Sequence, residues 1–338
     1  MPPEKPLSGE SALIAALSRL FGPTPAAVAV GIGDDCAALA VAGPDYLLWT
    51  VDTLLEGVHF DLSYFSLRQL GRKALAVNVS DIAAMGGEPL YAVLSLGWPR
   101  TRDPAGALTF GEGLAQAARE YGVAVIGGDT VSSPEGVMVT ISLLGRVPRG
   151  EMLTRRGAKV GDRIYVTGLL GEAAAGLEVL KRGLALEPDL HAALAQAHLD
   201  PQPQVHAGRV LAGQNLATAL IDLSDGVATD LGHVCRSSGV GARVPAATAP
   251  VSPRVQAAAP LLGANPLDLA LKGGEDFQLL FTSPVAKAPA LFQAFAQAGL
   301  PPPLPLGEIV AGAGVLLVTP EGEKDITGEG FDHFRLDL

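Results

Sequence analysis

The sequence of 338 residues lacks the features of several common protein classes. It has only two cysteines, Cys36 and Cys235, which lie far apart and match no zinc-binding or disulfide framework. No apolar run reaches the roughly 18 residues that a membrane-spanning helix needs. The N-terminal residues MPPEKPLSGE are polar, which argues against a signal peptide. We therefore expect a cytoplasmic protein with no membrane partner.

Basic residues are also scarce. The chain has 24 Lys and Arg against 35 Asp and Glu, which gives a formal net charge of −11. Because nucleic-acid affinity depends on neutralising phosphates with basic side chains, this balance argues against a nucleic-acid partner. The same negative field would repel a phosphate-bearing substrate unless carboxylates hold divalent cations beside it.

Two common signatures of phosphate transfer are missing from the sequence. It contains neither a G-x-x-x-x-G-K-[ST] loop nor the catalytic-loop and D-F-G motifs of protein kinases. Any phosphate chemistry in this protein must therefore use a different kind of site.

The composition is that of a globular protein, with 48% hydrophobic and 17% charged residues, and the length allows two domains. Strand-like and helix-like segments mix in both halves, which predicts an α/β or α+β fold. The apolar pattern lapses over residues 148–159, so we expect domains at 1–148 and 149–338. Residues 301–307, PPPLPLG, are predicted to be a loop, with two short strands after it.

A helix predicted over Leu67–Met85, with Ser66 as its cap, carries polar side chains in an apolar sequence. Asp81 lies there among Ala, Val, Ile and Met residues, and a buried carboxylate is costly unless a cation meets it. The basic residues nearby are Arg72 and Lys73, so a metal ion is the natural candidate. The alternative is that Asp81 is an ordinary cap or turn residue.

Further aspartates are predicted at the ends of strands, mostly beside Gly, Ser or Thr. They are Asp34, Asp35, Asp52, Asp129, Asp222 and Asp225. Small neighbours let the backbone approach an ion or a phosphate closely, and carboxylates suit Mg²⁺, which commonly shares phosphate oxygens with the protein. Asp and Gly also occupy ordinary turns, but several independent elements that end alike favour a magnesium site.

Eight motifs occur together and in order along the chain. They are GIGDDC (31–36), VDTLLEGVHF (51–60), NVSDIAAMGGEP (78–89), GGDT (127–130), LTRRGAKVGD (153–162), DLSDG (222–226), GGEDF (273–277) and GFDHF (330–334). Together they resemble the thiamine-monophosphate kinase family, which belongs to the aminoimidazole-ribotide-synthetase superfamily. The motifs DTLLEGVHF and GFDHF point to the kinases rather than to their relatives.

The resemblance implies an N-terminal α/β domain that pairs with its twin in a homodimer, followed by a C-terminal α/β domain. It also implies a reaction, the transfer of the γ-phosphoryl group of ATP to thiamine monophosphate. The products are thiamine diphosphate and ADP, and this is the last step of thiamine diphosphate biosynthesis.

The resemblance further assigns roles to residues. Several Mg²⁺ ions would be held by Asp34, Thr50, Val51, Asp52, Asp81, Asp129, Asp222 and Asp225. ATP would be contacted by Gly128, Asp129, Arg155 and Ser224, and thiamine monophosphate by His59, Glu275 and Phe331. The acceptor is itself a phosphate with a second pKa of about 6. We therefore expect direct in-line transfer that depends on positioning and cations, with no general base or covalent nucleophile.

Two positions depart from the family pattern. Val51 stands where a hydroxyl residue is common, so a metal contact there must come from its backbone. Gly111 stands where an aromatic residue often packs on adenine, which leaves the base contact open.

Two other functions stay open from the sequence. One is another ATP-dependent enzyme of the same superfamily. The other is a non-catalytic protein that binds magnesium and nucleotide, for which the two departures are the support. ATP binding without turnover would favour the second.

Overall fold

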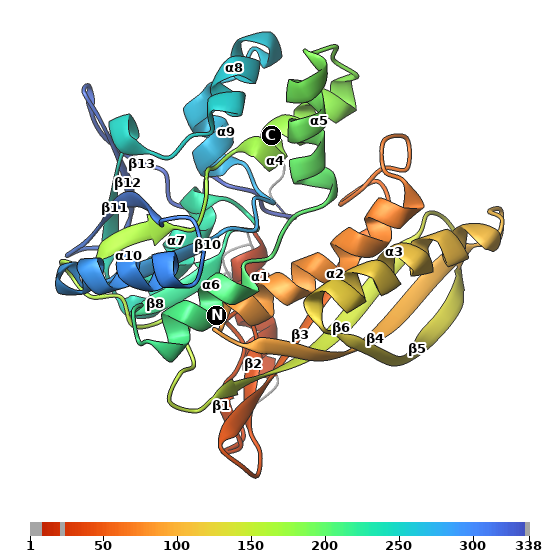
Figure 1. Cartoon of the computed structure of the whole chain (residues 1–338), viewed down its shortest axis with the longest axis horizontal. Helices are drawn as coiled ribbons and strands as arrows, with labels where there is room; N and C mark the ends of the chain where they lie inside the picture. The colour runs from red at the N-terminus through yellow and green to blue at the C-terminus, as the bar shows by residue number, and fades with distance from the viewer. Residues whose placement is uncertain (1–8, 21–23, 335–338) are drawn as a thin grey trace, which may run out of the picture.

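The structure is a computed structural model that describes residues 9–20 and 24–334. Two β-sheets, each with helices packed against it, make up the molecule, and helix α2 runs between them (Figure 1). None of the helices in these residues is both long and apolar enough to cross a membrane.

The first sheet has six strands in the order β1-β2-β3-β6-β4-β5, antiparallel except for the parallel pair β4 and β5. Its strands are β1 (Val28–Val30), β2 (Ala37–Ala40), β3 (Asp45–Leu55), β4 (Glu88–Pro99), β5 (Ala124–Ser133) and β6 (Met138–Pro148). The helices of this half are α1 (Glu10–Leu20), α2 (Leu67–Ala84) and α3 (Ala105–Tyr121). Helices α2 and α3 cover one face of the sheet (Figure 1).

The second sheet has seven strands in the order β13-β12-β9-β11-β7-β10-β8, in which β12 and β9 are the parallel pair. Its strands are β7 (Arg163–Val166), β8 (Ala219–Asp222), β9 (Gly241–Pro245), β10 (Leu279–Ser283), β11 (Leu304–Val310), β12 (Gly314–Thr319) and β13 (Gly322–Asp325). The helices are α4 (Glu172–Arg182), α5 (Pro188–Leu199), α6 (Val205–Gly213), α7 (Val227–Ser238), α8 (Pro253–Leu262), α9 (Pro266–Lys272) and α10 (Ala288–Gln297).

Both faces of this second sheet are covered, because successive side chains of β10 belong to two different buried clusters. Leu279 and Phe281 belong to one buried cluster with α6 and α10, whereas Leu280 belongs to another with α7 and α9. Successive side chains of a strand point to opposite faces, so a run of apolar residues is typical of a strand buried on both sides. The mixed α/β architecture predicted from the sequence is confirmed.

Helix α2 begins and ends as the sequence predicts. The Ser66 side chain accepts a hydrogen bond from the backbone N–H of Gln69, and the Gln69 side chain accepts one from the Ser66 N–H, a capping box. Gly86 follows the C-terminal end with φ +67°, a conformation that glycine adopts at little cost. Nearly every residue from Leu70 to Ala84 is buried, because this helix packs against both halves of the molecule.

Three predictions of local structure were wrong. Strands β3 and β5 run through Asp52 and Asp129 instead of ending there, because pairing with β6 and β4 continues past both residues. Strand β11 begins at Leu304, inside the predicted loop, so three strands rather than two finish the sheet. Pro305, which cannot donate to a ladder, lies at an irregularity in the pairing with β7, where proline is tolerated.

Helices α2 and α3 approach so closely that glycine is required between them. A Cβ atom at Gly113 would lie 2.0 Å from the backbone oxygen of Arg68, and one at Gly71 would lie 2.1 Å from that of Phe110. A Cβ at Gly111, in the same helix as Gly113, meets no heavy atom within 4 Å.

We expect Gly113→Ala to lower the free energy of unfolding by about 2 kcal/mol or more, because the added methyl forces the helices apart. Gly111→Ala is the matched control, and it should raise that free energy by about 0.5–1 kcal/mol through helix propensity alone. Urea unfolding followed by circular dichroism measures both. Equal effects of the two substitutions would contradict the close-contact explanation.

Candidate active site

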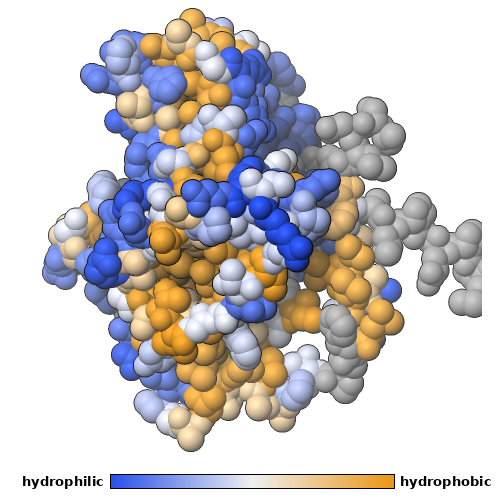
Figure 2. Space-filling view, turned by 90° about the vertical axis from the view of Figure 1, so that its right-hand side faces the viewer, coloured by the Kyte–Doolittle hydropathy of each residue, from blue (hydrophilic) through white to orange (hydrophobic). Residues whose placement is uncertain are grey.

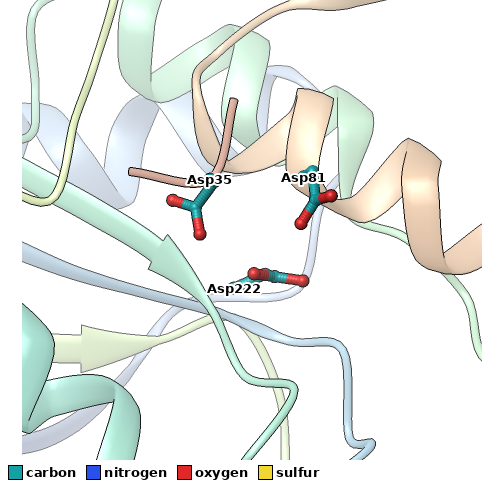
Figure 3. Close-up of side chains that lie close together, drawn as sticks. All are labelled: Asp35, Asp81 and Asp222. Atoms are coloured by element: carbon teal, nitrogen blue, oxygen red, sulfur yellow. The ribbon is translucent and has the colours of Figure 1, made fainter. Parts of the chain in front are cut away.

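Three aspartates from separate parts of the chain meet between the two sheets. Asp35 lies in the loop between β1 and β2, Asp81 in α2, and Asp222 at the end of β8. One carboxylate oxygen of each lies within 4.8 Å of the others, and Figure 3 shows the three side chains pointing toward a common space. Three oxygen ligands in this arrangement suit a hard divalent cation such as Mg²⁺.

Neighbouring polar groups fix these carboxylates. The Thr50 hydroxyl donates a hydrogen bond to Asp81, and the Ser80 hydroxyl donates one of 2.6 Å to Asp222 Oδ2. In β3, Thr50 alternates with the exposed Val51, so it points to the α2 side of the sheet. The Ser80 hydroxyl and the Asp222 carboxylate are both buried, which makes this contact a firm link between α2 and β8.

The carboxylates are crowded in a way that a cation would relieve. Burial raises the pKa of Asp222 to about 8, with the charge of Asp35 adding to the effect. Burial, followed by the charges of Asp52 and Asp222, raises the pKa of Asp81 well above its usual range. Burial also raises the pKa of Asp52 to about 6. Because a bound cation would stabilise the ionised forms, this donor set fits Mg²⁺.

Arg155 is the protein's own cation at this site. Its Nη2 lies 2.6 Å from Asp35 Oδ1, and its backbone N–H donates to Asp34 Oδ1 at 3.2 Å. The structure therefore brings Asp35 into the carboxylate cluster and directs Asp34 to the backbone of Arg155. Of the two aspartates in the GIGDDC motif, the family resemblance assigned a metal-binding role only to Asp34. The position of Asp35 next to it, in the same motif, was the sequence feature that could have identified Asp35.

The loop after β8 carries two of the predicted residues, Ser224 and Asp225. The backbone N–H groups of Asp225 and Gly226 donate to Asp230 Oδ2 at 3.1 and 3.0 Å. Asp230 is buried at the start of α7, so it holds this loop in place from within the helix. No sequence pattern points to Asp230, because its partners are the backbone groups of the folded loop.

The predicted residues Gly128, Asp129 and Val51 lie apart from the cluster. Gly128 and Asp129 belong to β5, which is separated from β3 by two intervening strands. At roughly 4.8 Å per strand, Asp129 is about 14 Å from the strand that carries Asp52. Val51 is exposed on the sheet face opposite Thr50, so only its backbone could meet an ion.

The residues predicted for thiamine monophosphate lie near one another. His59 Nε2 is 3.4 Å from His333 Nε2, and the ring of Phe331 packs edge-on against His333 with centroids 4.7 Å apart. The charge of Glu275 acts on His59, whose pKa is lowered chiefly by burial and then by His333. His333 was not selected from the sequence, although it stands in the GFDHF motif.

Glu275 is held as an ionised carboxylate. Lys73 Nζ lies 2.9 Å from its Oε1, and His198 Nδ1 lies 2.9 Å from its Oε2. Burial favours the neutral acid, but the charge of Lys73 and the close contact with His198 outweigh it and lower the pKa of Glu275 to about 2. This ion pair joins α2 and α5 to the loop before β10.

A cavity of about 560 Å³ lies beside these groups, because Ala197 and Asp276, the sequence neighbours of His198 and Glu275, line it. It is lined by Leu169, Glu172, Ala193, Gln196, Ala197, Asp200, Pro201, Gln202, Arg254, Asp276 and Gln278. The set contains no residue predicted for metal, ATP or substrate, and we assign it no role in the reaction.

Comparison with known proteins agrees with this arrangement. Residues 33–147 match the family model of the AIR synthase related protein, N-terminal domain, and residues 159–318 match that of the C-terminal domain. The fold and the carboxylate site thus define a two-domain protein of the AIR synthase related class.

Similar proteins within that class identify the family to which the chain belongs. The chain is 39% identical over 328 residues to the thiamine-monophosphate kinase of Escherichia coli O157:H7, and the aligned region covers 96% of this chain and 98% of the relative. It is 35% identical over 315 residues to that of Bacillus subtilis, covering 91% and 94%. The solved structure of AaThiL complexed with AMPPCP and TMP matches with a TM-score of 0.84 at 33% identity, covering 96% and 97%. The chain belongs to the thiamine-monophosphate kinase family.

We expect Asp222→Asn to raise the melting temperature of the metal-free protein by about 2 °C or more, because it removes a carboxyl group whose ionisation is disfavoured by burial and by Asp35 in the folded state. The raised pKa of Asp222, about 8, sets the sign of the pH dependence. The wild-type protein loses stability as pH rises, because folding opposes the ionisation of Asp222. The difference in melting temperature between the variant and the wild type should therefore grow from about pH 5 to about pH 9. With Mg²⁺, the wild-type melting temperature should rise and the variant should lose most of that rise.

Asp162→Asn is the matched control for this measurement. Asp162 is also buried, but its carboxylate accepts hydrogen bonds from the Lys159 N–H and the Thr218 hydroxyl, outside the cluster. This variant should melt lower with or without Mg²⁺ and keep the full rise. An Asp222→Asn protein that melts lower without metal and keeps the Mg²⁺ rise would count against the site.

Proposed function

We propose that the protein transfers the γ-phosphoryl group of ATP to thiamine monophosphate and forms thiamine diphosphate and ADP. The observation that carries this function is the meeting of Asp35, Asp81 and Asp222 beside Arg155, in a chain of the thiamine-monophosphate kinase family. The related AaThiL has been solved with AMPPCP, an ATP analogue, and TMP, which supports ATP and thiamine monophosphate as the substrates.

The geometry suits a transfer between two polyanions. Asp35, Asp52, Asp81 and Asp222, with Asp34 and Asp225 nearby, would hold Mg²⁺, whose charge offsets that of the phosphates when it is bound. Arg155 and Ser224 would position the nucleotide, and His59, Glu275 and Phe331 would position thiamine monophosphate. The acceptor phosphate is already an anion at neutral pH, so in-line transfer needs no general base and no covalent nucleophile.

We further propose that the protein works as a homodimer through its first sheet. Every residue of β5 from Ala124 to Thr130 is exposed. Beyond Trp49, strand β3 has no partner on its β2 side among residues 9–20 and 24–334. The face opposite α2 carries exposed apolar side chains, among them Trp49, Val51, Tyr91 and Val93. Figure 2 shows hydrophobic surface over the lower half of the side on which β5 lies in Figure 1.

A dimer of this kind would explain why Gly128 and Asp129, which the family resemblance assigns to the active site, lie far from the carboxylate cluster of their own chain. Within one chain, two strands separate β5 from β3. Two open sheet edges and an exposed apolar face are covered when β5 of one copy pairs with β3 of the other. The exposed Asp129 of one copy would then serve the carboxylate cluster of its partner.

We propose a domain boundary at residue 148, which is supported by the end of the first sheet at Pro148 and the start of the second at Arg163. We also propose that the protein acts in the cytoplasm, which its two free and buried cysteines support.

The reaction is tested by quantifying thiamine diphosphate and ADP after incubation with Mg-ATP and thiamine monophosphate. We expect equal amounts of both, none when Mg²⁺ is chelated, and at least about a 100-fold loss of turnover in Asp81→Asn, which removes a cation ligand. ADP without thiamine diphosphate would indicate a different substrate of the same superfamily. ATP binding without any turnover would favour a non-catalytic nucleotide-binding protein.

The shared site is tested by mixing two inactive variants. We expect Asp52→Asn and Asp129→Asn chains, unfolded and refolded together, to regain about a quarter of wild-type activity, because half of the dimers are mixed and each has one intact site. The control pairs Asp52→Asn with Asp81→Asn, whose residues face the same side of one chain, and should regain none. Failure of the first pair, with mixed dimers present, would place Asp129 in the site of its own chain.

A further inference from the structure

Lys73 is a fully buried lysine in the middle of α2. Its ammonium group lies 2.9 Å from Glu275 Oε1, donates to the His198 backbone oxygen at 3.1 Å, and sits 5.3 Å from the centre of the Phe65 ring. A lysine is almost never completely buried unless a partner compensates its charge. Of these partners, Glu275 is a residue of the proposed substrate site, and His198 also contacts Glu275.

The backbone of Glu275 is fixed as firmly as its side chain. It has φ +67°, a conformation that is uncommon for a residue with a side chain and that occurs mostly where surrounding structure imposes it. Its N–H donates to the Ser224 oxygen at 2.8 Å, and the Phe277 N–H donates to the Leu223 oxygen at 2.9 Å. The loop that presents Glu275 is thereby tied to the loop that carries Ser224.

His198 completes the support from the opposite side. It is buried, and Phe65 packs edge-on against its ring with centroids 5.5 Å apart. Burial, followed by the charge of Lys73, lowers its pKa, so the imidazole is neutral at physiological pH. Its Nδ1 lies 2.9 Å from Glu275 Oε2, so each carboxylate oxygen has one internal partner.

The remaining part of the carboxylate is open. The Glu275 side chain is 27% exposed, whereas those of Lys73 and His198 are 0% and 1% exposed. The charge of Glu275 also acts on His59 and Tyr64, from the segment after β3, and on the adjacent Asp276. The accessible part of the carboxylate thus has His59, a proposed substrate contact, in its surroundings.

We propose that Lys73 and His198 are positioning residues for thiamine monophosphate, which keep Glu275 ionised and fix the direction of its carboxylate toward the nitrogen-bearing rings of the substrate. The inference rests on the proposed function and assigns roles to two residues that lie behind the site. Each carboxylate oxygen can accept more than one hydrogen bond, so the internal partners leave acceptor capacity for substrate N–H groups.

The competing explanation is that Lys73 merely joins the two halves of the molecule. Arg72, its neighbour in α2, allows the two explanations to be separated. Arg72 is also buried, and it pairs with Asp200, just after α5, at 2.8 Å and with Glu120 of α3 at 2.9 Å. Both of these partners lie outside the set of residues proposed for metal, ATP or substrate.

The test compares Lys73→Met with Arg72→Met. We expect Lys73→Met to raise the KM for thiamine monophosphate about ten-fold or more, since the support of a charged acceptor is lost, with the KM for ATP within about two-fold of wild type. Without the lysine, burial would raise the pKa of Glu275. The ratio of variant to wild-type KM should therefore increase as pH falls from about 8 to about 6. Arg72→Met should lower the melting temperature and leave both KM values unchanged.

A double-mutant cycle with Glu275→Gln provides a second measurement. Once Glu275 carries no charge, adding Lys73→Met should change the KM for thiamine monophosphate little further. His198→Gln should raise that KM in the same direction, and it carries the test if Lys73→Met does not fold. An unchanged KM in the folded variants, equal changes in Arg72→Met, or additive effects in the cycle would overturn the inference. Absence of turnover in the wild-type protein would instead overturn the proposed function.

Discussion

The structure depends on the burial of like charges between its two sheets. Asp35, Asp81 and Asp222 come from three elements that are far apart in sequence, and each sheet contributes to the space that they share. The hydroxyl groups of Thr50 and Ser80 orient the carboxylates but add no charge. Folding therefore brings together a set of oxygen ligands whose ionised form a cation would stabilise, so the proposed binding of Mg²⁺ would strengthen the contact between the two halves.

Helix α2 is the element that makes this arrangement possible. It carries Lys73 in its first half and Asp81 eight residues further on, a separation of about 12 Å along the helix axis. Lys73 pairs with Glu275 before β10, and Asp81 meets Asp222 at the end of β8. Since β8 and β10 are neighbours in the second sheet, one helix sets the spacing between the proposed substrate carboxylate and the carboxylate cluster.

The sequence predicts the features that depend on local pattern. The mixed fold and the cap at Ser66 follow from local sequence patterns. The role of Asp81 as a metal ligand also comes from local pattern, and it stays a prediction. The contributions of Asp35, His198 and His333 cannot be predicted in this way, because each depends on contacts with residues more than seventy positions away. The path of β5 through Asp129 was also missed, since pairing with a neighbouring strand outweighs the turn preference of Gly and Asp.

The site uses two opposite ways of burying a carboxylate. Glu275 has a lysine of the chain as its partner, and its pKa is lowered, so it is an acceptor of constant charge. Asp81 and Asp222 lack an equivalent partner among their hydrogen bonds, and their pKa values are raised. A cation built into the chain would stay behind when a polyphosphate leaves, whereas a dissolved cation can arrive and depart with it. This difference fits a site in which Glu275 would recognise thiamine monophosphate with a constant charge. The charge of the aspartate cluster would instead change as cations bind and leave with ATP.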